Sequence, residues 1–396
     1  KRILQKLGIY NTVVETMLQN AKITLLLDGL NEVGESLKNE AINSIKRFMQ
    51  DYPKVFVLIT TRPNAYERNF FDNIGNRQKA PIFQLQEMDE NQIAEFLLKN
   101  STHHTTEQIN QAIQEHEALK NIIRTPLLLK MLIAQLNAQP NSKIPPTETD
   151  IILGFLNGVC HREHKRDAGF NARNFMEQIG FLAHQTRMRY EANATIDREE
   201  LLNLLELRYK RETAENLLAK AVELRLLTFN KIENRYSFVH ELYQEALWAK
   251  QQSVFETTPP PAQSAILYSL ALDLWYKEGF KQALRLYSGL LQADQRLNFV
   301  REISKRDIVL AARCIKINWK PEPELTQLVV DKAKRYAAFF NSDTHYSVSG
   351  FLALLELNDM ESIVQTIKRD KTGYESYIAK LTEAIPARQA LRLIST

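Results

Sequence analysis

The sequence has few cysteines and no long apolar runs, and both absences narrow the class of protein. Cys160 and Cys314 are the only cysteines in 396 residues. Two cysteines give no disulfide framework and suit a reducing compartment. No apolar run approaches the roughly eighteen residues of a membrane span, and the opening residues KRILQKLGIY contain no signal-peptide core. We therefore expect a cytoplasmic protein without a membrane-inserted segment.

An excess of charge of one sign is also lacking. Lysines and arginines number 51 against 47 aspartates and glutamates, which gives a net charge of +4. Because positive and negative charges nearly balance, there is no electrostatic reason to expect nucleic acid or an anionic membrane as a partner. The length allows two or three domains with sizeable cores.

A phosphate-binding loop is missing as well. The pattern GxxxxGK followed by Ser or Thr, whose backbone amides cradle phosphates, does not occur in the chain. The chain starts at Lys1 rather than Met and enters a helical pattern at once, with Ile3, Leu4 and Leu7 on one helix face. We expect that the sequence begins within a domain, and that a phosphate-binding loop either lies upstream or has been lost.

What is present is organised around the stretch KITLLLDGLNEV, residues 22–33. Residues 23–27 form an unbroken apolar run without polar alternation, which is typical of a strand buried on both faces. Asp28 follows this run directly, and Glu32 comes four positions later. Two carboxylates thus lie just beyond the carboxyl end of a predicted strand, at the edge where open α/β sheets bind ligands.

These carboxylates suit phosphoryl transfer. We expect Asp28 to hold a magnesium ion through its waters and Glu32 to orient an attacking water. The alternative is a buried strand that ends in an acidic turn without function. A helix over residues 35–49 and a second apolar strand over 55–59 follow, and then Arg62, which is placed to reach a terminal phosphate. Taken alone, an arginine such as Arg62 is more often a solvated loop cation, but its place after a strand, a helix and a second strand favours the functional interpretation.

The next segments predict mostly helices. A short strand at residues 82–85 leads to a helix that Asp89 caps. Thr125 and Pro126 then open an apolar helix over residues 124–136, which is ordinary helix-start chemistry for a proline. In the helix that follows, Cys160 and His164 share a face, but a zinc site needs four ligands and basic residues surround this pair, so a solvated helix end is the better interpretation.

Residues 170–250 predict three helices, a hairpin and a final helix, which is the order of a winged helix. Many such domains bind DNA. Residues 212–225, where a recognition helix would lie, mix three glutamates with arginine and lysine and show no basic face, so DNA binding is the weaker interpretation. His240 opens the final helix, where a histidine packed in a core is the common outcome.

Beyond three consecutive prolines at 259–261 the sequence is nearly all helical. The uneven helix pairs predict a degenerate array of HEAT-like or TPR-like units, a surface suited to binding a protein or peptide. The expected helices cover residues 265–276, 281–291, 308–317, 322–340, 348–357, 361–368 and 374–383.

Four of these segments together resemble the NACHT branch of the STAND nucleoside triphosphatases. The similar segments are LLLDGLNEV for the Walker B motif, VLITTRP for sensor 1, RTPLLLKML for the helical domain and YSFVHELYQEALWA for the winged helix. The resemblance implies five roles: magnesium binding by Asp28, catalysis by Glu32, γ-phosphate sensing by Arg62, adenine packing by Pro126, and contact of His240 with the β-phosphate of ADP. Asn31 departs from the family, in which many members have a second acidic residue there.

The resemblance implies an α/β and then mainly α chain of four parts. These are a partial P-loop ATPase core over residues 1–100, a helical domain over 101–168, a winged helix over 169–253 and an α-solenoid sensor over 262–396. Bound ADP would hold the inactive form, and exchange for ATP would release a self-oligomer that signals in immune or antiphage defence. ATP hydrolysis would belong to the full-length protein. Two alternatives remain, a STAND-type transcription regulator that binds DNA and a nucleotide-free helical scaffold.

Overall fold

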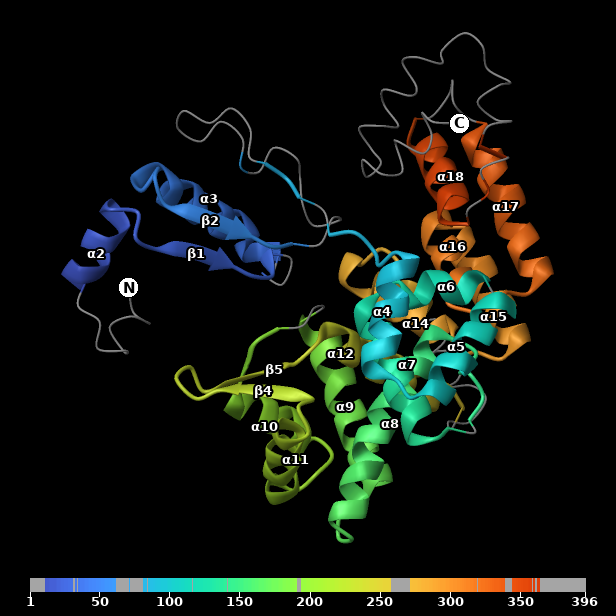
Figure 1. The fold of residues 1–396 in the computed structure, drawn as a ribbon, viewed down its shortest axis with the longest axis horizontal. Helices are drawn as coiled ribbons and strands as arrows, with labels where there is room; N and C mark the ends of the chain where they lie inside the picture. Colours follow the sequence, from blue (N-terminus) through green and yellow to red (C-terminus); the bar gives the residue numbers. More distant parts are fainter. Residues whose placement is uncertain are drawn as a thin grey trace. The chain divides into compact units, whose positions relative to one another are not determined.

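Most of the chain is helical, and contacts divide it into two compact units, Lys1–Gln86 and Glu87–Thr396 (Figure 1). The first unit is the small α/β part and the second holds nearly all of the helices. Within the part of the chain that is described, no helix is both long and apolar enough to cross a membrane. The computed structural model describes residues 11–30, 33, 35–61, 71, 81–83, 85–115, 117–140, 142–190, 194–257, 271–318, 320–338, 344–357, 359 and 362–363.

The small unit contains two parallel strands and two helices. Strand β1 (Thr24–Leu27) pairs in register with β2 (Phe56–Ile59), so the two strands end together. Helix α3 (Glu35–Asp51) connects them, and α2 (Asn11–Gln19) precedes β1. One face of the sheet packs on a small core of Leu30, Ile42 and Phe71, against which Ile59 and α3 residues lie.

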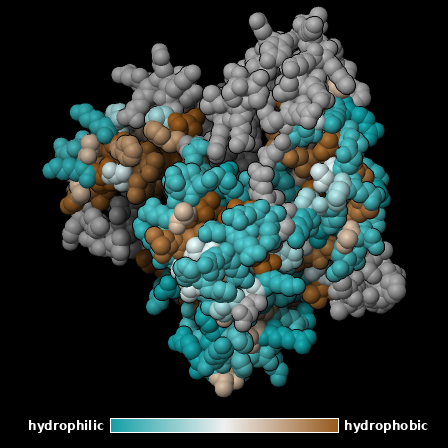
Figure 2. All heavy atoms as spheres, turned by 45° about the vertical axis from the view of Figure 1, so that its right-hand side comes forward, coloured by the Kyte–Doolittle hydropathy of each residue, from teal (hydrophilic) through white to brown (hydrophobic). Residues whose placement is uncertain are grey.

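The opposite face of this sheet is open, which corrects the prediction of strands buried on both faces. Leu26 is 67% exposed and Phe56 62%, and Leu58 beside Leu26 is also exposed. Figure 2 shows hydrophobic side chains at the surface of this unit. The sequence predicts that both faces of these apolar strands are buried. Within the described residues, other side chains cover one face only.

The second unit begins with α4 (Glu90–Asn100), which packs on α5 and α7. Ile82, Phe83 and Leu85 form no strand: Phe83 and Leu85 are almost fully exposed, and no described strand pairs with these residues. The boundary between the two compact units falls after Gln86, and the extent of the predicted ATPase core stays a prediction. Three further helices follow α4, namely α5 (His103–Glu115), α6 (Glu117–Ile123) and α7 (Pro126–Ala138).

Helix α8 (Glu148–Arg166) leads into a group of helices with a small sheet. The strand order is β3-β5-β4, all antiparallel, and the hairpin of β4 and β5 lies where the sequence predicts one. The final helix of the group starts directly after the hairpin. The elements are α9 (Ala172–Tyr190), β3 (Ile196–Asp197), α10 (Arg198–Glu206), α11 (Arg211–Glu223), β4 (Leu227–Asn230), β5 (Arg235–Phe238) and α12 (Glu241–Thr257).

The C-terminal part is a series of short helices. Four of its elements match helices expected from the sequence, and α15 lies where none was expected. The predicted helix at 374–383, the start of the one at 265–276 and most of the one at 361–368 lie outside the described residues. The elements are η3 (Glu278–Phe280), α14 (Lys281–Ser288), α15 (Ala293–Ser304), α16 (Ile308–Lys316), α17 (Pro323–Ala337) and α18 (Thr344–Glu356).

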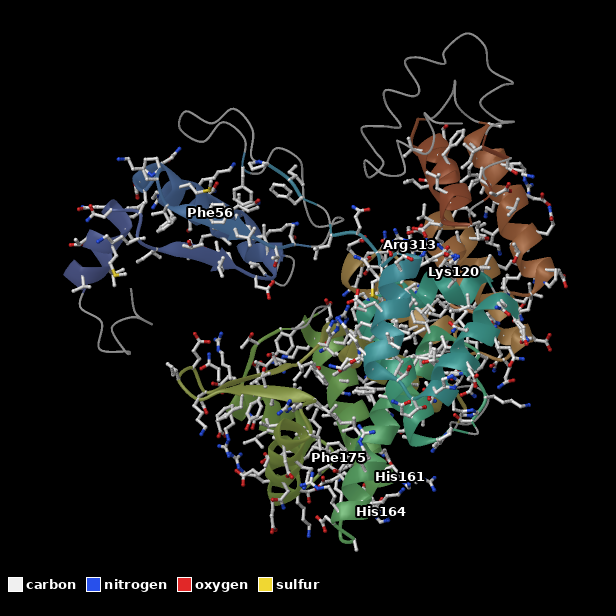
Figure 3. All side chains as sticks on the ribbon, viewed as in Figure 1. Phe56, Lys120, His161, His164, Phe175 and Arg313 are labelled. Carbon is white, nitrogen blue, oxygen red and sulfur yellow. The ribbon has the colours of Figure 1, made fainter. Side chains whose placement is uncertain are left out.

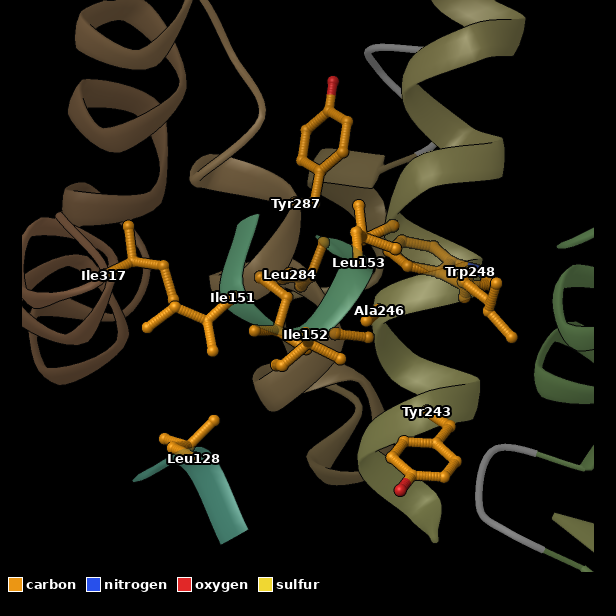
Figure 4. Packing of buried hydrophobic residues seen from close by; sticks show 14 of the residues in the cluster. Leu128, Ile151, Ile152, Leu153, Tyr243, Ala246, Trp248, Leu284, Tyr287 and Ile317 are labelled. Carbon is orange, nitrogen blue, oxygen red and sulfur yellow. The ribbon is translucent and has the colours of Figure 1, made fainter. Parts of the chain in front are cut away.

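A single hydrophobic core runs through the second unit, from Ile93 to Ile363. Figure 4 shows how α8, α12 and α14 meet in it, with Ile152 of α8 and Trp248 of α12 near the α14 residue Tyr287. The Trp248 ring lies 5.5 Å from that of Phe280 and 6.5 Å from that of Tyr287. The helix that begins after the hairpin is therefore packed directly on the C-terminal helices.

Candidate functional site

The carboxyl edge of β1 and β2 brings Asp28 and Thr60 together. Because the strands are parallel and in register, the residue after Leu27 lies beside the residue after Ile59. The Thr60 N–H donates to the Leu27 carbonyl at 2.9 Å, and the Leu30 N–H donates to the Thr60 carbonyl at 3.0 Å. The Thr60 hydroxyl donates to Asp28 Oδ1. The aspartate that the sequence singled out is thus oriented by the neighbouring strand.

Gly29 completes this arrangement. Its φ of 76° lies in the left-handed region, which a glycine adopts without the steric cost of a side chain. In this conformation the Gly29 N–H donates to Thr60 Oγ1 at 2.9 Å. The hydroxyl of Thr60 therefore accepts one hydrogen bond and donates another, which fixes its rotamer and with it the position of one Asp28 oxygen.

Asp28 has the chemistry of a magnesium ligand. Its side chain is exposed at the edge of the sheet, and a carboxylate is among the hard oxygen ligands that Mg²⁺ prefers. Mg²⁺ keeps several of its waters, so one carboxylate with a neighbouring hydroxyl is a sufficient protein contribution. The sequence identified Asp28 and missed Thr60. The available signal was that Thr60 directly follows the second strand of a predicted parallel pair.

Two of the predicted site residues, Glu32 and Arg62, lie outside the described residues, as does Asn31. The expectations that Glu32 activates a water and that Arg62 senses a terminal phosphate therefore stay predictions.

Pro126 is the first residue of α7, as the sequence predicted. Its ring is exposed, whereas Leu128 and Leu129 one turn later are buried. Thr125 occupies the cap position, but its side chain makes no capping hydrogen bond, so the proline itself starts the helix through its fixed φ. An exposed proline ring at a helix start is free of core contacts on its outer side and can pack against a planar ring.

His240 stands immediately before α12, and its ring caps the helix. The Leu242 N–H donates to His240 Nδ1 at 3.1 Å, and the Tyr243 N–H donates to the His240 carbonyl at 3.0 Å. An accepting Nδ1 carries no proton, so the neutral ring holds its proton on Nε2. His240 is half-buried rather than enclosed in the core. Its Nε2–H is a donor at the positive end of a 17-residue helix, a favourable place for an anion.

His164, which was weighed with Cys160 as a metal ligand, has another role. Its Nδ1 lies 2.6 Å from the Phe170 carbonyl. Figure 3 labels His161 and His164 at the far end of α8, near Phe175 of α9. No group of three His, Cys, Asp or Glu side chains suited to a metal ion occurs among the residues that the structure describes.

Two arginines near the sheet of β3, β4 and β5 are engaged with carboxylates. Arg211 at the start of α11 pairs with Glu199 at 2.6 Å and Glu206 at 3.1 Å, and Arg198 pairs with Glu215 at 2.9 Å. Reading a DNA groove requires arginines that can turn to bases or phosphates. To reach DNA, Arg198 and Arg211 would first have to give up their carboxylate partners in the same group of helices.

Comparison with models of protein families and with curated protein sequences finds no match for this chain.

Proposed function

We propose that this chain is part of a nucleotide-dependent molecular switch of the NACHT type, with ADP holding an inactive form and ATP promoting a self-oligomer. The observation that carries the proposal is the Asp28–Thr60 pair at the common carboxyl end of two parallel strands. A carboxylate held by a threonine hydroxyl at such an edge is the donor set that a magnesium nucleotide needs.

Asp28 and Thr60 would hold Mg²⁺ and its waters, and the ion would supply the positive charge that neutralises the nucleotide phosphates. The protein's own contribution is orientation. Thr60 holds one oxygen of Asp28 in place, and the left-handed Gly29 supplies the N–H that in turn fixes Thr60. Glu32, Arg62 and the exposed Pro126 would complete the set in the roles that the family resemblance gives them.

Helix α12 supports the second half of the proposal, the coupling of nucleotide to the C-terminal helices. It begins next to His240, the residue that would contact the β-phosphate of ADP, and its body carries Trp248 into the core shared with Phe280 and Tyr287. A contact made at its first turn therefore reaches the C-terminal helices through one rigid element. In this proposal those helices bind a protein or peptide ligand, whose binding favours the ATP form.

The magnesium half is tested by comparing Thr60→Val with Thr61→Val. Both substitutions replace a hydroxyl by a methyl group. Thr60 bonds Asp28, whereas the buried Thr61 hydroxyl has no hydrogen-bond partner among the residues that the structure describes. A hydrogen bond contributes about 1 kcal/mol, so Thr60→Val is expected to weaken Mg²⁺-dependent ADP binding about fivefold. Titration calorimetry on the longest natural form of the protein measures it. Equal affinities of the two variants would contradict the role of Thr60.

The switching half is tested by His240→Asn. Asparagine preserves a cap acceptor for the Leu242 N–H but removes the Nε2 donor, so α12 should remain intact while ADP binding weakens. We expect a shift toward the oligomer, measured by light scattering in the presence of ADP. His103→Asn, at an exposed position of α5, is the matched control. A scaffold that binds no nucleotide would show the same mass for both variants and for the wild type.

A further inference from the structure

A cavity of about 1070 Å³ lies within the second unit, among helices α7, α8, α9 and α12. It is formed by the later turns of α7 and α12, away from Pro126 and His240, which stand at the starts of those helices. Residues from four helices line it. A space of this size accommodates a small organic molecule of ordinary drug-like or metabolite dimensions.

The interior of the cavity is apolar and is open because small residues face it. Phe155, Met176 and Leu247 line its walls, and so does Gly158, where a larger residue would fill the space. Gly154 and Gly180 make room for the side chains of Gln135 and Gln251. A Cβ added at Gly158 would meet only Arg162 Nη1, at 3.6 Å, so this glycine borders open space. The walls therefore suit an apolar or aromatic body.

Two glutamine side chains also border the cavity. Gln251 on α12 is only 5% exposed and places an amide in the wall. Gln135 on α7 has a buried Oε1 without a hydrogen-bond partner among the described residues. Buried polar atoms in folded proteins normally find partners, so the Gln135 oxygen favours a ligand that donates to it.

Lys250, next to Gln251, carries a positive charge to the wall. Burial lowers the pKa of its ammonium group, and among the described residues no carboxylate pairs with it. A partly buried ammonium without a counter-ion is destabilising until an anion reaches it.

The rim repeats this excess of positive charge. Arg162, Lys165 and Arg173 line the opening, and none of them pairs with a carboxylate in the part of the chain that is described. Glu177 is the acid among the lining residues, and it is bound to Arg208 at 2.7 Å. These rim cations are exposed, so each contributes little alone, but together they favour the approach of an anion.

We propose that this cavity is a second binding site, which takes a small organic anion consisting of an apolar body and a negatively charged head group. The body lies against Phe155, Met176 and Leu247, and the head group binds Lys250 with the Gln251 amide beside it. Because Gln135 of α7 and Lys250 of α12 both line the site, the ligand holds these two helices together. This inference goes beyond the proposed nucleotide function and does not depend on it.

The probe for the test is 8-anilinonaphthalene-1-sulfonate, which has an aromatic body and one negative charge. N-phenyl-1-naphthylamine is the matched uncharged probe. Fluorescence titration of the full chain measures both dissociation constants, and the variant Gly158→Leu identifies the part of the signal that comes from the cavity. Leucine at this position fills the space and replaces a helix glycine, so the variant is expected to fold at least as well as the wild type.

The proposal expects Gly158→Leu to remove one class of bound sulfonate. Lys250→Met should weaken the affinity of the cavity for the sulfonate about tenfold relative to the wild type. Its affinity for the naphthylamine should stay within about twofold of the wild-type value. Lys130→Met, at an exposed position of α7 that does not line the cavity, should match the wild type. The proposal is overturned if Gly158→Leu binds as many sulfonate molecules as the wild type, or if Lys250→Met weakens both probes equally.

Discussion

Replacing Arg187 by methionine is expected to destabilise the second unit by about 3–5 kcal/mol. Arg187 on α9 is 1% exposed and binds two carboxylates at the start of α12, Glu241 at 2.9 Å and Glu245 at 3.1 Å. It also donates to the Gly279 carbonyl in the C-terminal part. Without the guanidinium group, two carboxylates of which at most 9% is exposed would lose the cation that binds them both.

A triple variant separates the cost of stranded charges from the value of the ion pairs themselves. Arg187→Met combined with Glu241→Gln and Glu245→Gln removes all three charges while keeping similar volumes. Replacing a complete buried ion pair by uncharged residues is often neutral or stabilising. We therefore expect the triple variant to lose less than half of the free energy of unfolding that the single variant loses.

Urea unfolding followed by tryptophan fluorescence measures both variants, because Trp248 is fully buried one turn after Glu245 and packs on Phe280. The comparison requires equal slopes of free energy against urea concentration. A loss below about 1 kcal/mol for Arg187→Met would mean that water reaches the carboxylates and that the network does not join α12 to its neighbours. An equal loss in the triple variant would contradict the charge argument.

Two further predictions concern stability. Burial lowers the pKa of His184 below its ordinary 6.5, so the unfolded chain binds a proton first as the pH falls. The contribution of His184 to the free energy of unfolding should therefore be constant above about pH 6.5 and fall as the pH drops below it. Urea titrations at several pH values should show that the free energy of unfolding depends less on pH in His184→Gln than in the wild type. Gly350→Ala should lower the free energy of unfolding by about 1–3 kcal/mol, since the added Cβ would lie 2.4 Å from the Ala337 nitrogen. Gly158→Ala should raise it by up to about 1 kcal/mol, and thermal unfolding measures both variants.

Segments with strong local patterns were predictable from the sequence. The apolar runs at β1 and β2 and the proline start of α7 appear as expected. The Asp89 capping box was also predicted, and the Gln92 N–H indeed donates to Asp89 Oδ1 at 2.9 Å. These features are local, so the identity and spacing of neighbouring residues determine them.

Features that depend on distant residues were not predictable. Helix α15 was missed because Arg296, which reads as a surface residue, is buried and donates to the Ser288 and Leu291 carbonyls. Strand β3 has two residues, too few to show a pattern. Strand 82–85 was predicted from apolar residues that turn out to be exposed.

The candidate site shows the same division. Asp28 follows from the general rule that ligands bind beyond strand ends, and His240 from its segment's resemblance to a family. Thr60 required the register of β1 and β2, which no local pattern gives. The cavity was not predictable at all, because four helices line it and residues such as Lys250 and Gln251 look like surface positions in the sequence.

Native mass spectrometry of the protein purified from its own cells tests the central claim most directly, because one spectrum reports the mass of the chain, the number of copies and any retained nucleotide. The switch proposal predicts a chain heavier than the 45.8 kDa of this sequence, with ADP bound, since the residues shown here contain no phosphate-binding loop. A chain of 45.8 kDa without nucleotide would contradict the proposal and favour a helical scaffold.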